Sequence, residues 1–413
     1  MKRAVDRRLI TGLLAIVVGC RPAPRVDIAP ERRGSSVRVG LLVRVPEATL
    51  KSRGAWRATS AEGTWTVPDG ASLRVWMEDG RLAAALENGV PHADASEIRL
   101  DPVSDESLLL VGTTPYRGEF RLRSDAGKVT VIDVLDIETY LRGVVGWEIG
   151  WLSSDLRAAV QAQAIAARTY TCARLGQFEV QGFDLYADER DQVYKGALRD
   201  DAVVDRAIAA TRGLVLRSEG RLIQAYYSST CGGYTSWIEH VWPKPAADYL
   251  RGQRDAAADG RSYCADSPHF RWTEAWSSTA LDQTLRETLP RVLQLPPDTR
   301  IGTLVDLRVV ERDASARVLD LDVETVDRTY RLHGDAIRWA LRPAGRPLLR
   351  SLMFELDLDR ADGALTRIVA RGGGNGHGVG MCQSGALGMA RRGLDCETIL
   401  EHYYPGARSA RTY

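Results

Sequence analysis

A single glutamate stands at the start of an alanine-rich segment. Glu148 lies between Trp147 and Trp151, shortly before a run free of glycine and proline that predicts a helix from Leu156 to about Arg174. Burial beside indole rings would raise the pKa of this carboxyl group, as a general acid requires near neutral pH. The alternative interpretation is a surface glutamate in front of a core helix.

The residues around Glu148 predict a strand, a turn and a capped helix. Val144 and Val145 form the expected strand, Gly146 the turn, and Ser153 or Ser154 the helix cap. Small side chains cover nearly every face of this helix, so other backbone can approach it closely. Its large polar residues are Gln163, Arg168 and Tyr170.

A second group of polar residues lies further along the chain. The loop 188–196 contains Asp191, and the glycine-rich run 372–381 contains His377 and precedes Gln383. That run has neither G-x-G-x-x-G nor a Walker lysine, so it gives little support for nucleotide binding. His377 is either a hydrogen-bonded structural histidine or a residue of a site.

Cysteine and histidine positions raise the question of a metal. Cys231, Cys264, His269 and Cys382 lie in loop-like segments, and Cys264 and His269 could together supply two ligands. Because there is no C-x-x-C, the zinc signal is weak. In an exported protein a disulfide is the commoner outcome, so we expect one between two of the three cysteines, with zinc as the alternative.

The N-terminus has the pattern of an export signal. Basic residues precede an apolar run, Leu9–Gly19, which is too short to span a membrane; it ends in Val-Val-Gly and is followed directly by Cys20. This ending resembles a bacterial lipobox with Cys20 as the lipid-bearing residue. We therefore expect a signal over residues 1–20, a tether over 21–36, and a protein lipid-anchored to the bacterial cell envelope.

The whole chain has 413 residues and a formal net charge of +1. This charge gives no support for nucleic-acid binding. Alternating apolar runs predict an α+β protein with a β-rich N-terminal part, a central small-residue helix packed with the glycine-rich loop and C-terminal helices, and an inserted α/β subdomain. The expected boundaries are 37–135 for the β-rich part, 136–275 and 361–413 for the core, and 276–360 for the insertion.

Several sequence blocks, taken in order, resemble the SpoIID/LytB family (stage II sporulation protein D). They are Tyr140–Val145 with Glu148, Ala162–Tyr170, Asp191–Gly196, Ser229–Gly233, Gly376–Met381 with Gln383 and Gly385-Ala386, and Ile399–Gly406. One departure is Gly146-Trp147, which stands where the family usually has a proline-rich turn. The matching blocks run from the β-rich part to the C-terminus.

This resemblance implies a peptidoglycan lytic transglycosylase that acts on glycan strands stripped of stem peptides. Glu148 occupies the position of the family's catalytic glutamate. The residues that would bind substrate or support the site are Gln163, Arg168, Tyr170, Asp191, His377 and Gln383. The resemblance requires no cofactor, and a metal known in some relatives carries over only onto Cys231. Other relatives are described as enhancers of wall amidases, so a non-catalytic partner of an amidase is the second hypothesis.

One carboxylate is enough for the implied chemistry. Ordinary glycosidases need two, because the second activates water or attacks the sugar. In a lytic transglycosylase the C6 hydroxyl of N-acetylmuramic acid is the nucleophile, and such intramolecular attack can have an effective molarity of about 10⁵–10⁸ M. Glu148 would act first as acid and then as base.

Overall fold

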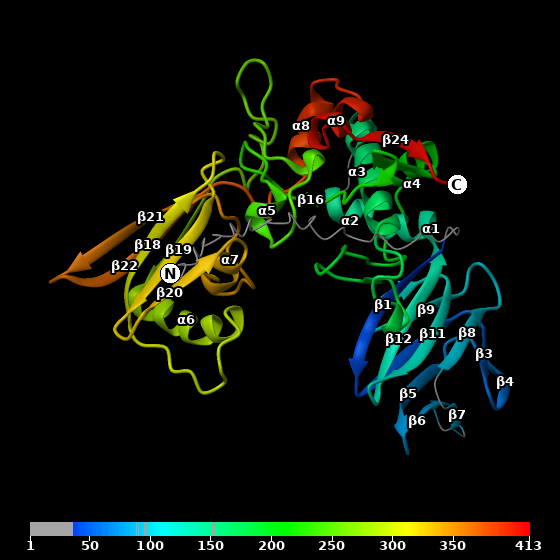
Figure 1. Ribbon diagram of the computed structural model, residues 1–413. Coiled ribbons are helices and arrows are strands. Elements are labelled where there is room, and N and C mark those ends of the chain that lie inside the picture. Colours follow the sequence, from blue (N-terminus) through cyan, green and yellow to red (C-terminus); the bar gives the residue numbers. More distant parts are fainter. Residues whose placement is uncertain (1–35, 88, 90, 95–96, 151–152) are drawn as a thin grey trace, which may run out of the picture. The chain divides into compact units, whose positions relative to one another are not determined.

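The computed structural model describes residues 36–413 apart from 88, 90, 95–96 and 151–152. The predicted lipid site at Cys20 and the tryptophan at position 151 therefore lie outside the described residues. Figure 1 shows a mixed α and β architecture with a β-rich N-terminal part, which confirms the predicted fold class. No helix in the described part is long and apolar enough to cross a bilayer.

The N-terminal part consists of short strands in two sheets that share one buried core (Figure 1). One sheet has the order β13-β1-β12-β11-β8-β3-β4 and the other β10-β9-β2-β5-β6-β7. The bounds are β1 Ser36–Val45, β2 Glu47–Arg53, β3 Trp56–Ser60, β4 Gly63–Val67, β5 Ser72–Glu78, β6 Arg81–Leu86, β7 His92–Asp94, β8 Glu97–Pro102, β9 Leu108–Val111, β10 Thr114–Tyr116, β11 Glu119–Asp125, β12 Lys128–Asp136 and β13 Leu185–Tyr186.

Alternation of apolar and polar residues explains these strands. In β2 every second side chain is buried, including Ala48 and Leu50, while its charged residues face outward. Strands β11 and β12 are antiparallel and join at a tight turn, where Ala126 and Gly127 both have positive φ. Strand β12 ends at Asp136, whose carboxylate accepts a hydrogen bond from the Glu138 amide and so caps α1, Ile137–Arg142.

The segment after α1 differs from the sequence prediction. Instead of a strand, Val145–Ile149 form the short helix α2, which carries Glu148. The predicted serine cap is also wrong, because Ser153 precedes a 3₁₀ turn, Ser154–Leu156, without making a side-chain capping bond. The central helix α3 then runs from Arg157 to Cys172, close to the prediction.

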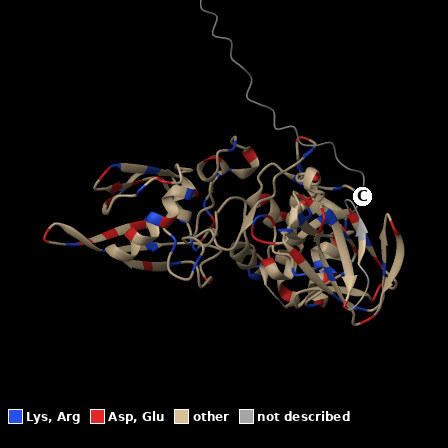
Figure 2. Ribbon diagram, turned by 90° about the horizontal axis from the view of Figure 1, so that it is seen from below, with Lys and Arg blue, Asp and Glu red and all other residues tan. Residues whose placement is uncertain are grey.

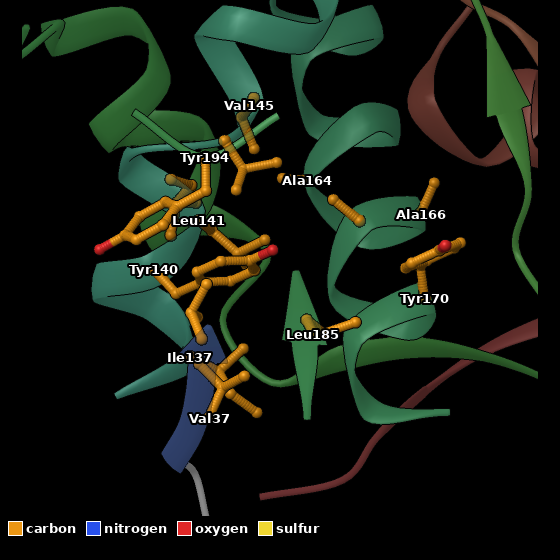
Figure 3. Packing of buried hydrophobic residues seen from close by; sticks show 14 of the residues in the cluster. Val37, Ile137, Tyr140, Leu141, Val145, Ala164, Ala166, Tyr170, Leu185 and Tyr194 are labelled. Carbon is orange, nitrogen blue, oxygen red and sulfur yellow. The ribbon is translucent and has the colours of Figure 1, made fainter. Parts of the chain in front are cut away.

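Helix α3 is buried by elements that precede it and elements that follow it in the sequence. It contacts α1, α2, α4, β14, α8 and α9. Figure 3 shows Ala164 and Ala166 on this helix, with Tyr140, Leu141 and Val145 packed nearby. The bounds of these later elements are α4 Ala202–Ala210, β14 Leu214–Ser218, β15 Arg221–Leu222, β16 Tyr227–Ser228, α5 Ile238–Val241, β23 Met381–Cys382, α8 Gln383–Arg391, α9 Cys396–Tyr403 and β24 Arg408–Arg411.

A second hydrophobic core lies between Trp272 and Ala370. We call the residues that build it, 272–372, the inserted unit; they begin and end in the antiparallel pair β17–β22, where Trp272 lies opposite Gly372. Its elements are β17 Trp272–Ser277, α6 Ser278–Val292, β18 Leu304–Arg312, β19 Val318–Thr325, β20 Thr329–His333, α7 Ala336–Ala340, β21 Phe354–Ala361 and β22 Ala364–Gly372. Acidic and basic residues are interspersed throughout the molecule (Figure 2).

Candidate active site

Glu148 is half-buried and its carboxylate is held on both oxygens. Oε1 accepts a hydrogen bond from the Val193 amide at 2.8 Å, and Oε2 accepts one from Gln383 Nε2 at 3.3 Å. Burial raises the pKa of Glu148, and these two hydrogen bonds partly oppose that rise. The nearby charge of Glu189 raises the pKa further. A raised pKa is also what the tryptophan-rich sequence around Glu148 predicted.

The loop that carries Val193 is fixed by close backbone packing against the end of α1. The Lys195 amide donates to the Gly143 carbonyl at 3.0 Å. A Cβ atom at position 143 would lie 2.5 Å from the Tyr194 ring and 2.6 Å from the Gly196 carbonyl, so only glycine allows this approach. The Tyr194 hydroxyl then donates to the buried carboxylate of Asp133 at 2.8 Å. The Val193 amide is thereby held against Glu148.

Gln383 reaches Glu148 from the far end of the sequence. Gln383 is the first residue of α8, which packs against α3. Because of this packing, Gln383 Nε2 also lies 3.4 Å from Gln163 Oε1. Gln163 is fully buried, yet its own Nε2 has no hydrogen-bond partner in the part of the chain that the structure describes. The structure therefore brings Glu148, Gln163 and Gln383 together and leaves a buried donor beside them.

A network of tyrosines and one glutamine borders the same carboxylate. Tyr227 donates to Gln192 Oε1 at 2.7 Å, and Gln192 Nε2 contacts Tyr140 and Thr171 at 3.1 and 2.9 Å. Burial raises the pKa of Tyr227, and the charge of Glu148 raises it further. These hydroxyls therefore stay protonated and act as hydrogen-bond donors.

Asp191 and Tyr170 belong to an adjoining cluster. The Tyr170 hydroxyl lies 3.2 Å from Asp191 Oδ1, and the Arg174 guanidinium stacks 3.4 Å from the centre of the Tyr170 ring. Arg174 Nε is 3.6 Å from Asp191, whereas its buried Nη1 has no partner among the described residues. Burial raises the pKa of Asp191. The cluster adjoins the Glu148 network through the Tyr170 and Tyr227 rings, whose centres are 6.2 Å apart.

Arg168 faces a different part of the molecule. Its guanidinium forms a two-pronged ion pair with Glu138, at 3.0 and 2.6 Å, and donates to the Leu214 carbonyl. Glu138 also accepts hydrogen bonds from the Gly213 amide and the Tyr413 hydroxyl. Arg168 thus joins α1, α3, β14 and the C-terminus, and none of its hydrogen bonds reaches Glu148.

His377 lies in the glycine-rich loop beside Trp242 and Tyr226, with ring centres 4.9 and 6.1 Å away. Its Nδ1 accepts a hydrogen bond from the Val379 amide, and burial lowers its pKa to about 4. The imidazole is therefore neutral near pH 7. The loop packs tightly here because Gly380 has φ +70° and a Cβ there would lie 2.1 Å from the Tyr226 carbonyl oxygen.

Three of the four predicted disulfide or metal candidates come together. The thiols of Cys231, Cys264 and Cys382 and the carboxylate of Asp255 are all buried, and their ligand atoms lie within 4.8 Å of one another. Hydrogen bonds with Cys231 and Cys382 lower the pKa of the Cys264 thiol to about 5. His269 is not part of this cluster, because its Nδ1 faces Arg350 at 3.1 Å. No disulfide joins the cysteines of the described chain.

Some residues of these clusters had no signal of their own in the sequence. Asp255 lies in a polar stretch rich in alanine and aspartate, with nothing to distinguish it from Asp259. Gln192 lies inside the block Asp191–Gly196, and its place in that block was the one feature of the sequence that pointed to a role in the site. Tyr227 precedes the Ser229–Gly233 block by two residues, where a strand interior was the simpler reading.

Comparison with known proteins supports the assignment suggested by the sequence blocks. Residues 125–217 match the model of the stage II sporulation protein family, and residues 259–380 match a domain of unknown function (DUF8618). The first match contains Glu148 and the second contains the whole inserted unit.

Three relatives cover most of the chain. An uncharacterised protein of Brachyspira hyodysenteriae is 31% identical over 67% of this chain and 67% of its own length. Stage II sporulation protein D of Bacillus amyloliquefaciens is 29% identical over 67% of this chain and 74% of its own. The amidase enhancer of Bacillus subtilis is 25% identical over 82% of this chain, which spans only half of that relative. Together with the geometry around Glu148, these matches show that the chain belongs to the SpoIID/LytB family.

Proposed function

We propose that this protein is a lytic transglycosylase that cleaves peptidoglycan glycan strands lacking stem peptides. The observation that carries the proposal is the environment of Glu148: a half-buried carboxyl group with a raised pKa, held by a backbone amide and by Gln383. A carboxyl group of this kind keeps a protonated fraction closer to neutral pH than an exposed one does.

In the proposed reaction Glu148 transfers one proton in each direction. Protonated Glu148 donates to the glycosidic oxygen as the bond from that oxygen to C1 of N-acetylmuramic acid breaks. The C6 hydroxyl of the same sugar then attacks C1, and the Glu148 carboxylate takes its proton. The products are a 1,6-anhydro end and a free 4-hydroxyl on N-acetylglucosamine, so no water is consumed and no cofactor takes part in the bond changes.

Other side chains supply hydrogen bonds in this scheme. Gln163 Nε2 and Arg174 Nη1 are buried donors without a partner among the described residues, and such donors are costly until a ligand or water accepts their hydrogen bonds. They suit the hydroxyl, acetamido or lactyl carboxylate groups of the sugars. Gln383 and the Val193 amide position the carboxylate of Glu148. Arg168 and His377 brace the surrounding elements.

The proposed place of action is the cell envelope. The basic N-terminal residues, the short apolar run and the lipobox-like ending support export and lipid attachment at Cys20. A lipid anchor would hold the protein at a membrane surface, where glycan strands are within its reach.

A non-catalytic role is the second candidate, and one observation favours it. The relative from Bacillus subtilis that aligns over 82% of this chain is named an amidase enhancer. In that case the chain would bind the wall and stimulate a separate amidase, and Glu148 would contribute to structure alone.

Product analysis separates the two candidates. We expect the purified full-length protein to release fragments ending in 1,6-anhydro-N-acetylmuramic acid from denuded glycan strands, as measured by mass spectrometry. Glu148→Gln keeps the shape of the side chain but not its proton transfer, so cleavage should fall by about 10²–10⁴-fold.

The matched control is Glu189→Gln, which removes a nearby exposed carboxylate and should leave the products unchanged. Reducing ends in place of anhydro ends would mean hydrolysis. Full cleavage by Glu148→Gln would remove this residue from the mechanism. Lack of cleavage by the unaltered protein, together with stimulation of an added amidase, would favour the enhancer role.

A further inference from the structure

The cluster formed by Cys231, Asp255, Cys264 and Cys382 joins four separate segments of the chain. All four side chains are 0 or 1% exposed. Cys231 follows β16, Cys382 ends the neighbouring strand β23, and Asp255 and Cys264 come from the long connection before the inserted unit.

The donor atoms have the spacing of a tetrahedral metal site. Cys231 Sγ lies 3.6 Å from Cys264 Sγ and 3.0 Å from Asp255 Oδ2. Zinc bound to sulfur at about 2.3 Å gives tetrahedral edges of about 3.8 Å, so these separations need only small side-chain shifts. Three sulfurs and one carboxylate oxygen are also donor types that zinc accepts.

Surrounding groups already orient the ligands. Asp255 Oδ1, the oxygen not used toward Cys231, contacts Tyr403 Oη at 2.8 Å and His402 Nε2 at 3.2 Å, which leaves Oδ2 directed into the cluster. Backbone amides of Cys231 and Gly385 donate to Cys382 Sγ at 3.1 and 3.2 Å. Hydrogen bonds of this kind hold metal ligands in place and support negative charge on sulfur.

The charge in this region favours a bound cation. A fully buried carboxylate beside three thiols is costly unless positive charge compensates it. Arg317 of the inserted unit is 1% exposed and lies beside the cluster, but its hydrogen bonds go to the carbonyls of Cys231 and Thr235 and to Ser315 Oγ. Its charge therefore reaches the cluster without a direct bond to any of the four side chains.

We propose that Cys231, Asp255, Cys264 and Cys382 bind one structural zinc ion. Four protein ligands close the coordination sphere, which is the arrangement of a structural site. The ion would fix strand β23 against the Cys231 loop and so position Gln383, the residue that follows Cys382 and contacts Glu148. Arg317, bonded to the Cys231 carbonyl, links the inserted unit to the same site. This inference stands independently of the proposed reaction.

Metal analysis of the full-length protein tests the proposal. Purified without chelators, it should contain about one zinc ion per chain by elemental mass spectrometry. Cys382→Ser should lower that content by about tenfold or more, whereas Asp255→Cys keeps four donors and should retain zinc. Cys396→Ser is the control, because this cysteine lies outside the cluster and its loss should change nothing.

A second measurement covers variants that fail to fold. Protein stripped of metal and titrated with Co²⁺ should show the near-ultraviolet charge-transfer bands of thiolate-bound cobalt and the visible bands of a tetrahedral site. A Cys231–Cys264 disulfide in the native protein, found by peptide mapping after alkylation, would overturn the proposal. So would zinc content in Cys382→Ser equal to that of the unaltered protein, or a cobalt complex without thiolate bands.

Discussion

Two opposing influences act on the Glu148 carboxyl group. Burial raises its pKa, while hydrogen bonds from Val193 and Gln383 stabilise the ionised form and lower it. The backbone amide cannot be removed by substitution, but the Gln383 side chain can. Gln383 thus offers a way to test whether the ionisation of Glu148 controls the reaction.

We predict that Gln383→Leu moves the alkaline limb of the pH–rate profile to higher pH. Loss of the Nε2 donor raises the pKa of Glu148, so the protonated acid persists to higher pH than in the unaltered protein. The maximal rate should fall by about tenfold, because the carboxylate is less well positioned. The measurement is the rate of anhydro-product release between pH 4 and about 9.

Gln163→Leu is the matched comparison for this prediction. Gln163 contacts Gln383 but makes no hydrogen bond to Glu148, so its loss should lower the rate while leaving the alkaline limb near its original pH. A profile for Gln383→Leu that coincides with that of the unaltered protein would argue against Glu148 as the titrating acid.

At the scale of elements, the pair Arg168–Glu138 shows how the family's alanine-rich helix is held. Arg168 is fully buried in α3 and Glu138, at the start of α1, is 6% exposed. Arg168 also donates a hydrogen bond to the Leu214 carbonyl of β14, and the Tyr413 hydroxyl donates one to Glu138. Removing one partner of such a pair leaves a buried charge unpaired, which is far more costly than losing an exposed pair.

We predict that Arg168→Met lowers the free energy of unfolding by about 3–5 kcal/mol. The exposed pair of Arg190 with Asp188 supplies the control, and Arg190→Met should cost no more than about 1 kcal/mol. Urea unfolding followed by circular dichroism measures both. The folded fraction of Arg168→Met should keep the alkaline limb of the pH–rate profile, since Arg168 does not touch Glu148; a shifted limb would instead place Arg168 in the site.

Elements with a strong local signal were predictable from the sequence. The alternating strands, the α3 helix and the helix α8 after the glycine-rich loop follow from periodicity, alanine content and helix-breaking residues. The short helix α2 was missed because Val144 and Val145 have high strand propensity. Their burial between α1 and α3 decides the outcome, and that is a tertiary effect.

The site was predictable in part for the same reason. Glu148, Gln163 and Gln383 lie in blocks that the family resemblance identified, and the structure brings them together. Asp255 has a position fixed by contacts with Tyr403 and His402 from the end of the chain, which no local pattern encodes. His269 was expected near the cysteines on sequence spacing, but its ring is held beside Arg350.

At the scale of the molecule, the chain assembles its site from both sides of the inserted unit. Glu148, Gln163 and Val193 precede that unit, while Gln383 follows it. Hydrogen bonds join the inserted unit to the core. The Asp335 amide donates to the Val241 carbonyl, and His240 Nδ1 lies 3.1 Å from Asp313 Oδ2. These two contacts hold the inserted unit to residues 240 and 241 of the core, whereas the Cys231 loop and the glycine-rich loop are joined directly by hydrogen bonds between Thr230 and Asn375.

The proposed placement of the protein at a membrane rests on the sequence of its N-terminal segment. Residues 2–8 are rich in Lys and Arg, the apolar run is too short to cross a bilayer, and Val-Val-Gly precedes Cys20. A single acyl chain gives only marginal membrane binding, whereas several chains on one cysteine hold a protein firmly. If Cys20 carries the lipid, its sulfur is essential for anchoring and irrelevant to the chemistry at Glu148.

We predict that Cys20→Ser abolishes incorporation of labelled fatty acid and shifts the protein from the membrane fraction to the soluble one, or leaves the signal uncleaved. Cys172→Ser, which alters a cysteine at the end of α3, should keep both the label and the membrane association. Cell fractionation and fluorography of labelled cells measure these outcomes. Labelling of Cys20→Ser at the level of the unaltered protein would show that the lipid is attached elsewhere. Purified Cys20→Ser protein should still cleave denuded strands at an undiminished rate, because the serine replaces a residue that the proposed reaction does not use.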